Sequence, residues 1–203
     1  GIAQYRPKRG NARGRYWCCS RMGQDKALLT ISQSTMLTRT YQLLLEASVS
    51  KVVISRNDGE AGHFSDLYPG KGPLSGIHSA AMRFPDKNLL ILPIDLPLMD
   101  VCTIQRLLDS GEKFSSNVRF GEHSLPLYLR NTETTRQTLD YTLRCTNSFS
   151  VDRFCTHFPL MKLQLRQQSP LFNSNTPEQW RFAMQHFKTS DNSAPTEVRH
   201  GTC

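Results

Sequence analysis

The residues best suited to chemistry begin with the stretch Ser-Arg-Met-Gly-Gln-Asp-Lys at positions 20–26. Arg21 and Lys26 place two cations around Gly23. A bound triphosphate needs this combination, because cations neutralise its charge and a glycine lets backbone N–H groups approach the phosphates. The spacing leaves a second interpretation open, in which the stretch is a solvated turn that leads into a helix.

A single carboxylate, Asp95, follows an apolar run in the stretch Leu-Pro-Ile-Asp-Leu-Pro. Pro93 and Pro97 flank it and restrict the turn. A carboxylate in this place can hold Mg²⁺ against phosphate oxygens. The alternative is an Asp that only caps the following turn, and the residue by itself does not separate the two.

Two further stretches offer groups that could contact a nucleotide. Gly72 and Gly76 surround an expected helix start, where N–H groups and the helix dipole favour an anion or a polar base edge. Asn57 either contacts a base or ribose or makes a turn. Asp66 either accepts hydrogen bonds from the N1 and N2 groups of a guanine or lies in a surface loop. The six histidines form no i,i+4 pair, so core or surface roles are expected for them.

The elements that must position these residues alternate between strand and helix. Apolar runs at 51–55 and 88–95 predict strands buried on both faces, and 160–166 alternates as another strand. Residues 115–130 predict a hairpin that turns near Gly121 and Glu122. The pattern therefore indicates the α/β class: a three-layer α/β/α Rossmann-like domain with a mostly parallel sheet, whose ligands sit at the carboxyl ends of the strands.

Helix signals fill the intervals between these strands. A helix from a Ser34 cap would place Leu37, Tyr41, Leu44 and Leu45 on one face. Further helices are expected at 72–84, 132–145 and 150–158, and at 100–111 with an Asp100 cap and a Gly111 stop. Residues 175–187 predict a helix with a capping box formed by Thr176 and Gln179.

Length and composition narrow the class of protein. The chain of 203 residues is long enough for one sizeable domain, and no apolar run reaches membrane-spanning length. Six cysteines without paired CxxC spacing argue against a zinc site or a disulfide framework and favour the cytoplasm. The formal charge is +8, but residues 1–21 carry six of the Lys and Arg residues and no acid. The nearly neutral remainder argues against a nucleic-acid partner.

Taken in order, the stretches RMGQDKALL, VVISRN, GPLSGI, LPIDLPLM, LPLYLR and FNSNTPEQW resemble the MobA-type molybdenum cofactor guanylyltransferases. These belong to the wider nucleotidyltransferase group. The resemblance covers Ser20 to about Phe187, and the late NSNTPEQW favours the guanylyl branch over the cytidylyl one. It implies transfer of GMP from GTP to molybdopterin that bears molybdenum, with release of pyrophosphate.

The resemblance also implies roles for individual residues. Lys26 would bind the triphosphate with help from Arg21, and Asp95 would hold Mg²⁺. Asn57 and Asp66 would contact the nucleotide, and the guanine pocket would be shaped by Gly72, Pro73 and Leu74. Nucleotidyl transfer depends on in-line positioning and charge neutralisation, so no protein nucleophile is required. Molybdoenzyme maturation proteins are the expected protein partners.

The N-terminal segment departs from the family pattern. Members carry a strand that runs into Leu-Ala-Gly-Gly, whereas the aligned places here hold Arg15, Tyr16, Trp17 and Cys18. Residues 1–19 are expected to be aberrant or disordered, through a reading-frame error or decay of a paralogue, and to leave the domain without its central strand and glycine loop. Weak or absent catalysis follows as an expectation. The nucleotidyltransferase domain is expected at 20–188 and a flexible tail at 189–203.

Two other functions remain open at this point. One is a nucleotidyltransferase of the same fold that uses CTP or a sugar phosphate. The other is a non-catalytic nucleic-acid-binding protein that would use the Arg-rich N-terminus with Tyr5, Tyr16 and Trp17 as stacking groups.

Overall fold

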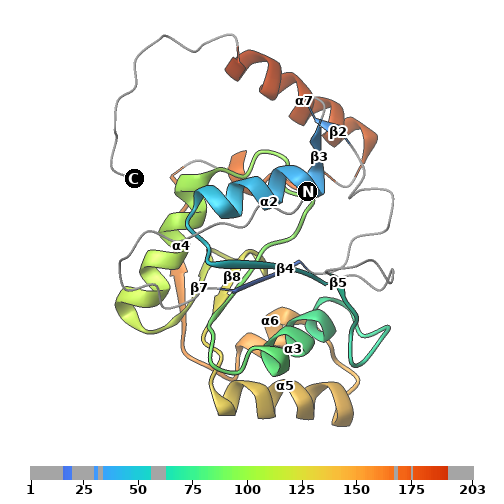
Figure 1. Cartoon of the computed structure of the whole chain (residues 1–203), viewed down its shortest axis with the longest axis vertical. Coiled ribbons are helices and arrows are strands. Elements are labelled where there is room, and N and C mark those ends of the chain that lie inside the picture. Colours follow the sequence, from blue (N-terminus) through green and yellow to red (C-terminus); the bar gives the residue numbers. More distant parts are fainter. Residues whose placement is uncertain are drawn as a thin grey trace.

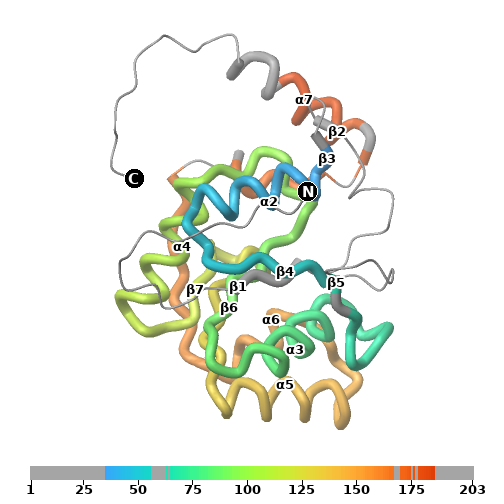
Figure 2. The backbone as a smooth tube through the Cα atoms, viewed as in Figure 1, coloured from blue at the N-terminus to red at the C-terminus, as the bar shows by residue number. Residues whose placement is uncertain are grey.

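The computed structural model describes residues 16–19, 30–31, 34–55, 63–166, 169–174 and 176–191. A central sheet lies between two layers of helices, which confirms the three-layer α/β/α prediction (Figure 1). Helices α2 (Met36–Glu46) and α4 (Val101–Phe114) cover one face. Helices α3 (Pro73–Arg83), α5 (Glu133–Cys145) and α6 (Val151–Cys155) cover the other. The tube in Figure 2 shows the same layers.

The sheet contains seven of the described strands in the order β5-β4-β1-β6-β8-β7-β9. Only β8 runs against its neighbours, so the sheet is mostly parallel, as predicted. The strands are β1 (Tyr16–Cys19), β4 (Lys51–Ser55), β5 (His63–Phe64), β6 (Leu89–Ile91), β7 (Asn117–Phe120), β8 (Leu127–Leu129) and β9 (Leu160–Leu163). A separate antiparallel pair joins β2 (Thr30–Ile31) to β3 (Ser34–Thr35).

The strand β1 corrects the expectation that the domain lacks its central strand. Tyr16 lies opposite Lys51 of β4 on one side and opposite Leu89 of β6 on the other, and both pairings are parallel. Four residues are enough for this strand, and the aromatic residues Tyr and Trp favour strands. The prediction failed because it assigned these residues to a loop and judged the strand from the basic run that precedes them.

Two predicted helices differ from expectation in detail. Helix α2 is capped by Thr35 and not by Ser34, and it buries Met36, Thr40 and Leu44. Tyr41 and Leu45, which were expected on the buried face, are exposed. The observed buried set begins one residue earlier than expected, an offset of about 100° around the axis, and it is decided by packing against the sheet and α4 rather than by the cap.

Helix α4 begins at its predicted cap but does not end at the predicted glycine. Asp100 Oδ1 accepts a hydrogen bond from the N–H of Thr103 at 2.6 Å. The helix continues through Gly111 to Phe114, and Ser115 ends it with a left-handed backbone (φ 46°). A Cβ on Gly111 would lie 2.2 Å from the ring of Tyr128, so this glycine serves the contact between α4 and the sheet.

Helix α7 (Pro177–Asp191) confirms its predicted capping box. The N–H of Thr176 donates to Gln179 Oε1 at 3.0 Å, and the N–H of Gln179 donates to Thr176 Oγ1 at 3.2 Å. A short 3₁₀ turn, η1 (Ser169–Leu171), precedes it. The helix runs beyond the expected end of the domain at 188, while the remaining residues of the expected tail lie outside the described part.

The cysteines are not all reduced. Cys102 is disulfide-bonded, whereas Cys145 and Cys155 are free thiols. Burial raises the pKa of the Cys155 thiol to about 11. Among the described residues, three or more His, Cys, Asp or Glu side chains nowhere gather as a metal site. No helix in that part of the chain is long and apolar enough to cross a membrane.

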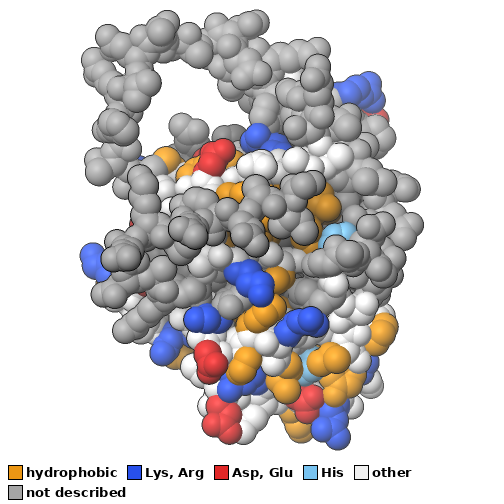
Figure 3. Space-filling view, viewed as in Figure 1, with side chains coloured by type: hydrophobic (Ala, Val, Ile, Leu, Met, Phe, Trp, Pro, Cys, Tyr) orange, Lys and Arg blue, Asp and Glu red, His pale blue; other side chains and the backbone are white. Residues whose placement is uncertain are grey.

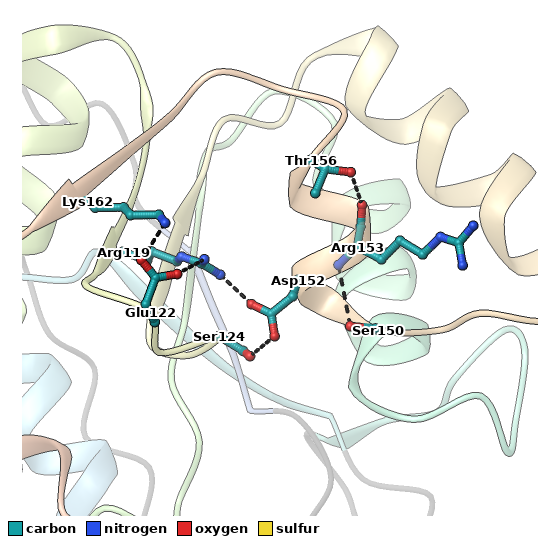
Figure 4. A network of polar contacts seen from close by, with 8 residues as sticks. All are labelled: Arg119, Glu122, Ser124, Ser150, Asp152, Arg153, Thr156 and Lys162. Carbon is teal, nitrogen blue, oxygen red and sulfur yellow. Dashed lines mark hydrogen bonds and ion pairs between the residues drawn. The ribbon is translucent and has the colours of Figure 1, made fainter.

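A polar network ties the β7–β8 turn to β9 and α6 (Figure 4). Arg119 of β7 is buried and donates to Asp152 of α6 and, at 3.4 Å, to Glu122. Lys162 of β9 donates to Glu122 at 2.6 Å, and Ser124 donates to Asp152 at 2.5 Å. The hydrogen bond from Ser124, followed by that from Arg119, lowers the pKa of Asp152 although burial opposes the shift.

We expect Gly111→Ala to lower the free energy of unfolding by about 1–3 kcal/mol, because the added methyl group overlaps the buried Tyr128 ring. Urea unfolding measures the change. Asp109→Ala, at an exposed position of the same helix, is the control and should change stability by less than about 0.5 kcal/mol. Equal stability of the two variants would contradict the close packing of α4 on Tyr128.

The network in Figure 4 predicts an acid-sensitive contribution to stability. A carboxyl whose pKa is lower in the folded chain stabilises the fold above its unfolded pKa of about 3.9. That contribution disappears as the pH falls through the folded pKa. Asp152→Asn should therefore be destabilising at pH 7, and its difference from the wild type should shrink as the pH falls from about 5 to 3. A pH-independent difference in unfolding free energy would show that the charge of Asp152 contributes nothing.

Candidate nucleotide-binding site

The carboxyl ends of β4, β1 and β6 meet at one edge of the sheet, because these three neighbouring strands are parallel. Each strand leads into one of the stretches singled out in the sequence. Arg21 and Lys26 follow β1 and Asn57 follows β4, and all three lie outside the described residues. The structure describes the other predicted site residues, which are Asp66, Gly72, Pro73, Leu74 and Asp95.

Asp66 lies two residues after β5 and is buried beside Ser55, the last residue of β4, so it is not a surface residue. The residue is 8% exposed, and its carboxylate accepts a hydrogen bond from Ser55 Oγ at 3.2 Å. Gly76 of α3 faces this pair, since a Cβ there would lie 2.9 Å from Ser55 Oγ and 3.5 Å from Asp66 Oδ1. The predicted glycine therefore allows α3 to lie close to the last residue of β4.

The N-terminus of α3 has the backbone that the glycine-rich stretch predicts. Gly72 is the N-cap, with φ 67° and ψ −161°, a conformation that L-residues adopt only at a cost. Pro73 occupies the first turn, where its missing N–H is of no consequence. The positive end of the helix dipole gives this terminus an affinity for anions and polar base edges.

Leu74 follows Pro73 in the first turn of α3. Its side chain has no exposure and packs in the core beside Ile77, Leu89 and Ile91. It therefore fixes α3 against the sheet. Any contact that it makes with a nucleotide would come from its backbone.

The loop after β6 holds Asp95 between buried apolar neighbours. Ile94 and Leu96 are buried on either side, and Asp95 is itself 8% exposed. The backbone oxygen of Asp95 accepts hydrogen bonds from the N–H of Ser174 at 3.1 Å and from its Oγ at 3.5 Å. The late Asn-Ser-Asn-Thr-Pro-Glu stretch thus lies against the loop that carries the predicted metal-binding carboxylate.

Arg39 of α2 fixes the same loop from another direction. Its Nε donates to the backbone oxygen of Pro97 at 3.1 Å, and its NH2 group donates to that of Met99 at 3.3 Å. Burial lowers the pKa of the Arg39 guanidinium, with the charge of Glu46 acting in the opposite sense. Two segments distant in sequence therefore hold the turn around Asp95.

Sequence reasoning missed three residues that support this site: Ser55, Ser174 and Arg39. Ser174 lies inside a stretch that already indicated the family, which was a usable signal. Ser55 ends a predicted strand, and nothing in its neighbours indicates that it contacts Asp66. Arg39 lies 58 and 60 residues from its two partners, so no local pattern could reveal it.

A cavity elsewhere in the molecule is separate from these residues. It has a volume of about 470 Å³ and lies between α5 and α6, where Tyr141, Arg153 and His157 are among its lining side chains. None of the sequence-predicted site residues lines it.

We expect Gly76→Ala to destabilise the chain by about 1–2 kcal/mol, because the methyl group overlaps Ser55 Oγ. Thermal and urea unfolding measure the loss. The double variant Ser55→Ala with Gly76→Ala removes the overlapping atom. Its loss in free energy of unfolding should therefore be clearly smaller than the sum of the losses in the two single variants. Strictly additive costs would refute the close contact between α3 and β4.

Comparisons with known proteins identify the family of the chain. Residues 19–146 match the family described as MobA-like NTP transferase domain. A molybdenum cofactor guanylyltransferase of Xanthomonas euvesicatoria is 32% identical over 165 residues, which cover 79% of this chain and 86% of that protein. One of Rhizobium meliloti is 30% identical over 188 residues, with 81% and 85% covered.

Solved structures show the same fold. A 2-C-methyl-D-erythritol 4-phosphate cytidylyltransferase from Thermus thermophilus superposes with a TM-score of 0.64 at 12% identity and covers 85% of this chain and 98% of its own. A Mycobacterium tuberculosis protein solved as a complex with manganese gives a TM-score of 0.62 at 16% identity, with 85% and 98% covered. At these identities the likeness concerns the fold alone. Through its sequence match, the chain belongs to the MobA-like NTP transferase family.

Proposed function

We propose that the chain transfers GMP from GTP to the phosphate of molybdopterin that bears molybdenum, and so forms the guanine dinucleotide cofactor. An oxygen of the acceptor phosphate attacks the α-phosphorus of GTP, the bond to the bridging oxygen breaks, and pyrophosphate leaves. The observation that carries the proposal is the contact between two family stretches beyond the carboxyl end of β6: the backbone oxygen of Asp95 accepts hydrogen bonds from Ser174. Relatives named molybdenum cofactor guanylyltransferase support it.

The nucleotide is assigned to the edge formed by β4, β1 and β6. Lys26 and Arg21, which follow β1 in the sequence, would neutralise the triphosphate. Asn57 and Asp66 would contact the nucleoside, and Gly72 and its neighbours would approach the base with backbone groups. The burial of Asp66 beside Ser55 supports a carboxylate held in one direction rather than one that samples solvent.

The residues present suit a divalent cation at Asp95. Mg²⁺ prefers oxygen ligands and in phosphate-transfer sites uses one or two carboxylates together with substrate phosphates and water. Asp95 supplies such a carboxylate on a turn that Ser174 and Arg39 hold from two sides. Bound there, Mg²⁺ would neutralise phosphate charge. The chain's own part is to orient the carboxylate and to restrict access of water.

The contact between Asp95 and Ser174 supports an acceptor site on the same side. The stretch around Ser174 lies within hydrogen-bonding distance of the Asp95 backbone, so a ligand bound by one segment would lie close to the other. In-line transfer requires the acceptor phosphate and the α-phosphorus to be neighbours.

Catalysis is expected to be slow. The strand β1 supplies the central strand, but the residues aligned with the family glycines are part of it, and Gly23 is the only glycine between Cys19 and Thr30. Backbone N–H groups of a glycine-rich loop normally surround the phosphates, and bulky residues cannot adopt the same conformations. We expect a rate below that of a relative with the intact glycine loop.

Two alternatives rank lower. A cytidylyltransferase shares the fold, but at 12% identity this does not bear on the nucleotide. Nucleic-acid binding would require a basic surface, and on the face seen in Figure 3 the Lys and Arg side chains of the described residues are interspersed with acidic and hydrophobic ones. A cytoplasmic site of action and delivery of the product to molybdoenzyme maturation proteins remain parts of the proposal.

Calorimetry of the purified chain with GTP, CTP and ATP in Mg²⁺ tests the nucleotide assignment. We expect selective binding of GTP, weakened about tenfold or more by Asp95→Asn, because the metal loses a charged ligand. Asp86→Asn, at an exposed turn, is the matched control and should bind like the wild type. Equal binding of all three nucleotides, or no binding of any, would contradict the proposal.

A further inference from the structure

The loop that leads into α3 is joined to helix α5 by side-chain contacts. Tyr68 Oη donates to Asp140 Oδ1 at 2.9 Å, and Nε2 of His78 lies 3.5 Å from the same oxygen. Lys71 Nζ donates to the backbone oxygen of Leu143. We name Tyr68, Lys71, His78 and Asp140 the α5 latch.

The latch is an organised cluster and not a set of loose surface contacts. His78 is 2% exposed, and within the described residues neither ring nitrogen makes a hydrogen bond, since the approach to Asp140 is too long for a good one. The Tyr68 and His78 rings lie 5.1 Å apart. Lys71 Nζ lies 5.5 Å from the centre of the Tyr68 ring and 4.9 Å from that of Phe149.

The surroundings of Asp140 keep its carboxylate ionised, so that it accepts the hydrogen bond from Tyr68. Burial raises the pKa of the Asp140 carboxyl, but hydrogen bonds from Tyr68 and Arg144 outweigh it and the net shift is downward. Burial lowers the pKa of the His78 imidazole. At neutral pH the cluster therefore contains an ionised Asp140 that receives the phenol hydrogen bond, beside a neutral imidazole.

The same loop is also attached to β4 and to α3. Asp66 contacts Ser55 of β4, the N–H of Leu67 donates to Ser79 Oγ at 2.8 Å, and Ser75 Oγ donates to the Tyr68 carbonyl at 2.5 Å. Beyond Tyr68 the chain passes through Gly70 and Gly72, both at positive φ. Such glycines allow many backbone conformations, so this part depends on side-chain contacts with α5 to hold one of them.

From this geometry we infer that the α5 latch positions the N-terminus of α3, and through it the nucleotide subsite. Tyr68 and Asp140 are positioning residues that act through Gly72 and Pro73 and need not touch the substrate. The inference rests on the proposed function in one respect only, which is that the nucleotide binds at the α3 N-terminus. The claim that α5 holds the loop before α3 does not depend on any ligand.

Hydrogen exchange of the full-length chain without nucleotide tests whether α5 holds this loop. Tyr68→Phe removes one hydroxyl and keeps both ring contacts. We expect the amide hydrogens within residues 67–74, which the two prolines of this segment lack, to exchange about tenfold faster, because a hydrogen bond to a charged group is lost. Tyr141→Phe makes the same chemical change at a 62% exposed position of α5 and should leave these amides unchanged.

Steady-state kinetics with GTP then distinguish an effect on the position of the nucleotide subsite from an effect on the stability of the whole fold. Tyr68→Phe and Asp140→Asn should raise KM for GTP about tenfold and leave kcat within about twofold, because a displaced subsite weakens binding and the reacting groups are retained. The inference is overturned if residues 67–74 exchange at the wild-type rate in Tyr68→Phe. It is equally overturned if exchange rises evenly through the whole chain, which would indicate a role in stability alone. A wild-type chain that binds no GTP would refute the proposed function, while the exchange comparison would still decide whether the latch exists.

Discussion

The parallel pairing of β1 with β4 and β6 is the constraint on which the rest of the structure depends. No other described strand lies between β4 and β6, so the backbone hydrogen bonds of Tyr16–Cys19 hold the two halves of the sheet together. Because all three strands run in one direction, their carboxyl ends meet at a single edge. The segments that follow them, together with residues 66–74 after the neighbouring strand β5, carry every residue to which we assign a role in catalysis or nucleotide binding.

Apolar packing of the helices and a few polar contacts then fix the helices and loops around the paired strands. Two hydrophobic clusters attach the helices to opposite faces of the sheet, with Leu44 and Leu107 in one and Ile77 and Leu139 in the other. A few polar contacts then fix the loops: Ser55 with Asp66, and Ser174 with the Asp95 backbone. Such buried polar contacts are costly to leave unpaired, so they specify one loop position more strictly than apolar packing alone does.

The sequence predicted well those features whose signals are local. The capping box of α7, the Asp100 cap and the hairpin at Gly121 each depend on residues a few positions apart, and the structure confirms them. Predictions failed where tertiary contacts decide. The strand β1 forms because of partners far along the chain, and Gly111 is required by the ring of Tyr128 rather than by a helix end. For the proposed site, the family pattern pointed to Asp66 and Asp95, but it could not reveal that Ser55 contacts Asp66 or that Arg39 and Ser174 contact the Asp95 loop.

The most direct test of the account follows the α-phosphate of GTP. The chain is incubated with GTP labelled at that phosphate, Mg²⁺ and molybdenum-loaded molybdopterin, and both the labelled product and pyrophosphate are quantified. The account predicts that label enters a guanine dinucleotide in equal amount to the pyrophosphate released, only when the acceptor is present. The rate should be below that of a relative with an intact glycine loop. Label that stays in GTP, or that transfers equally well from CTP, would contradict the guanylyltransferase assignment.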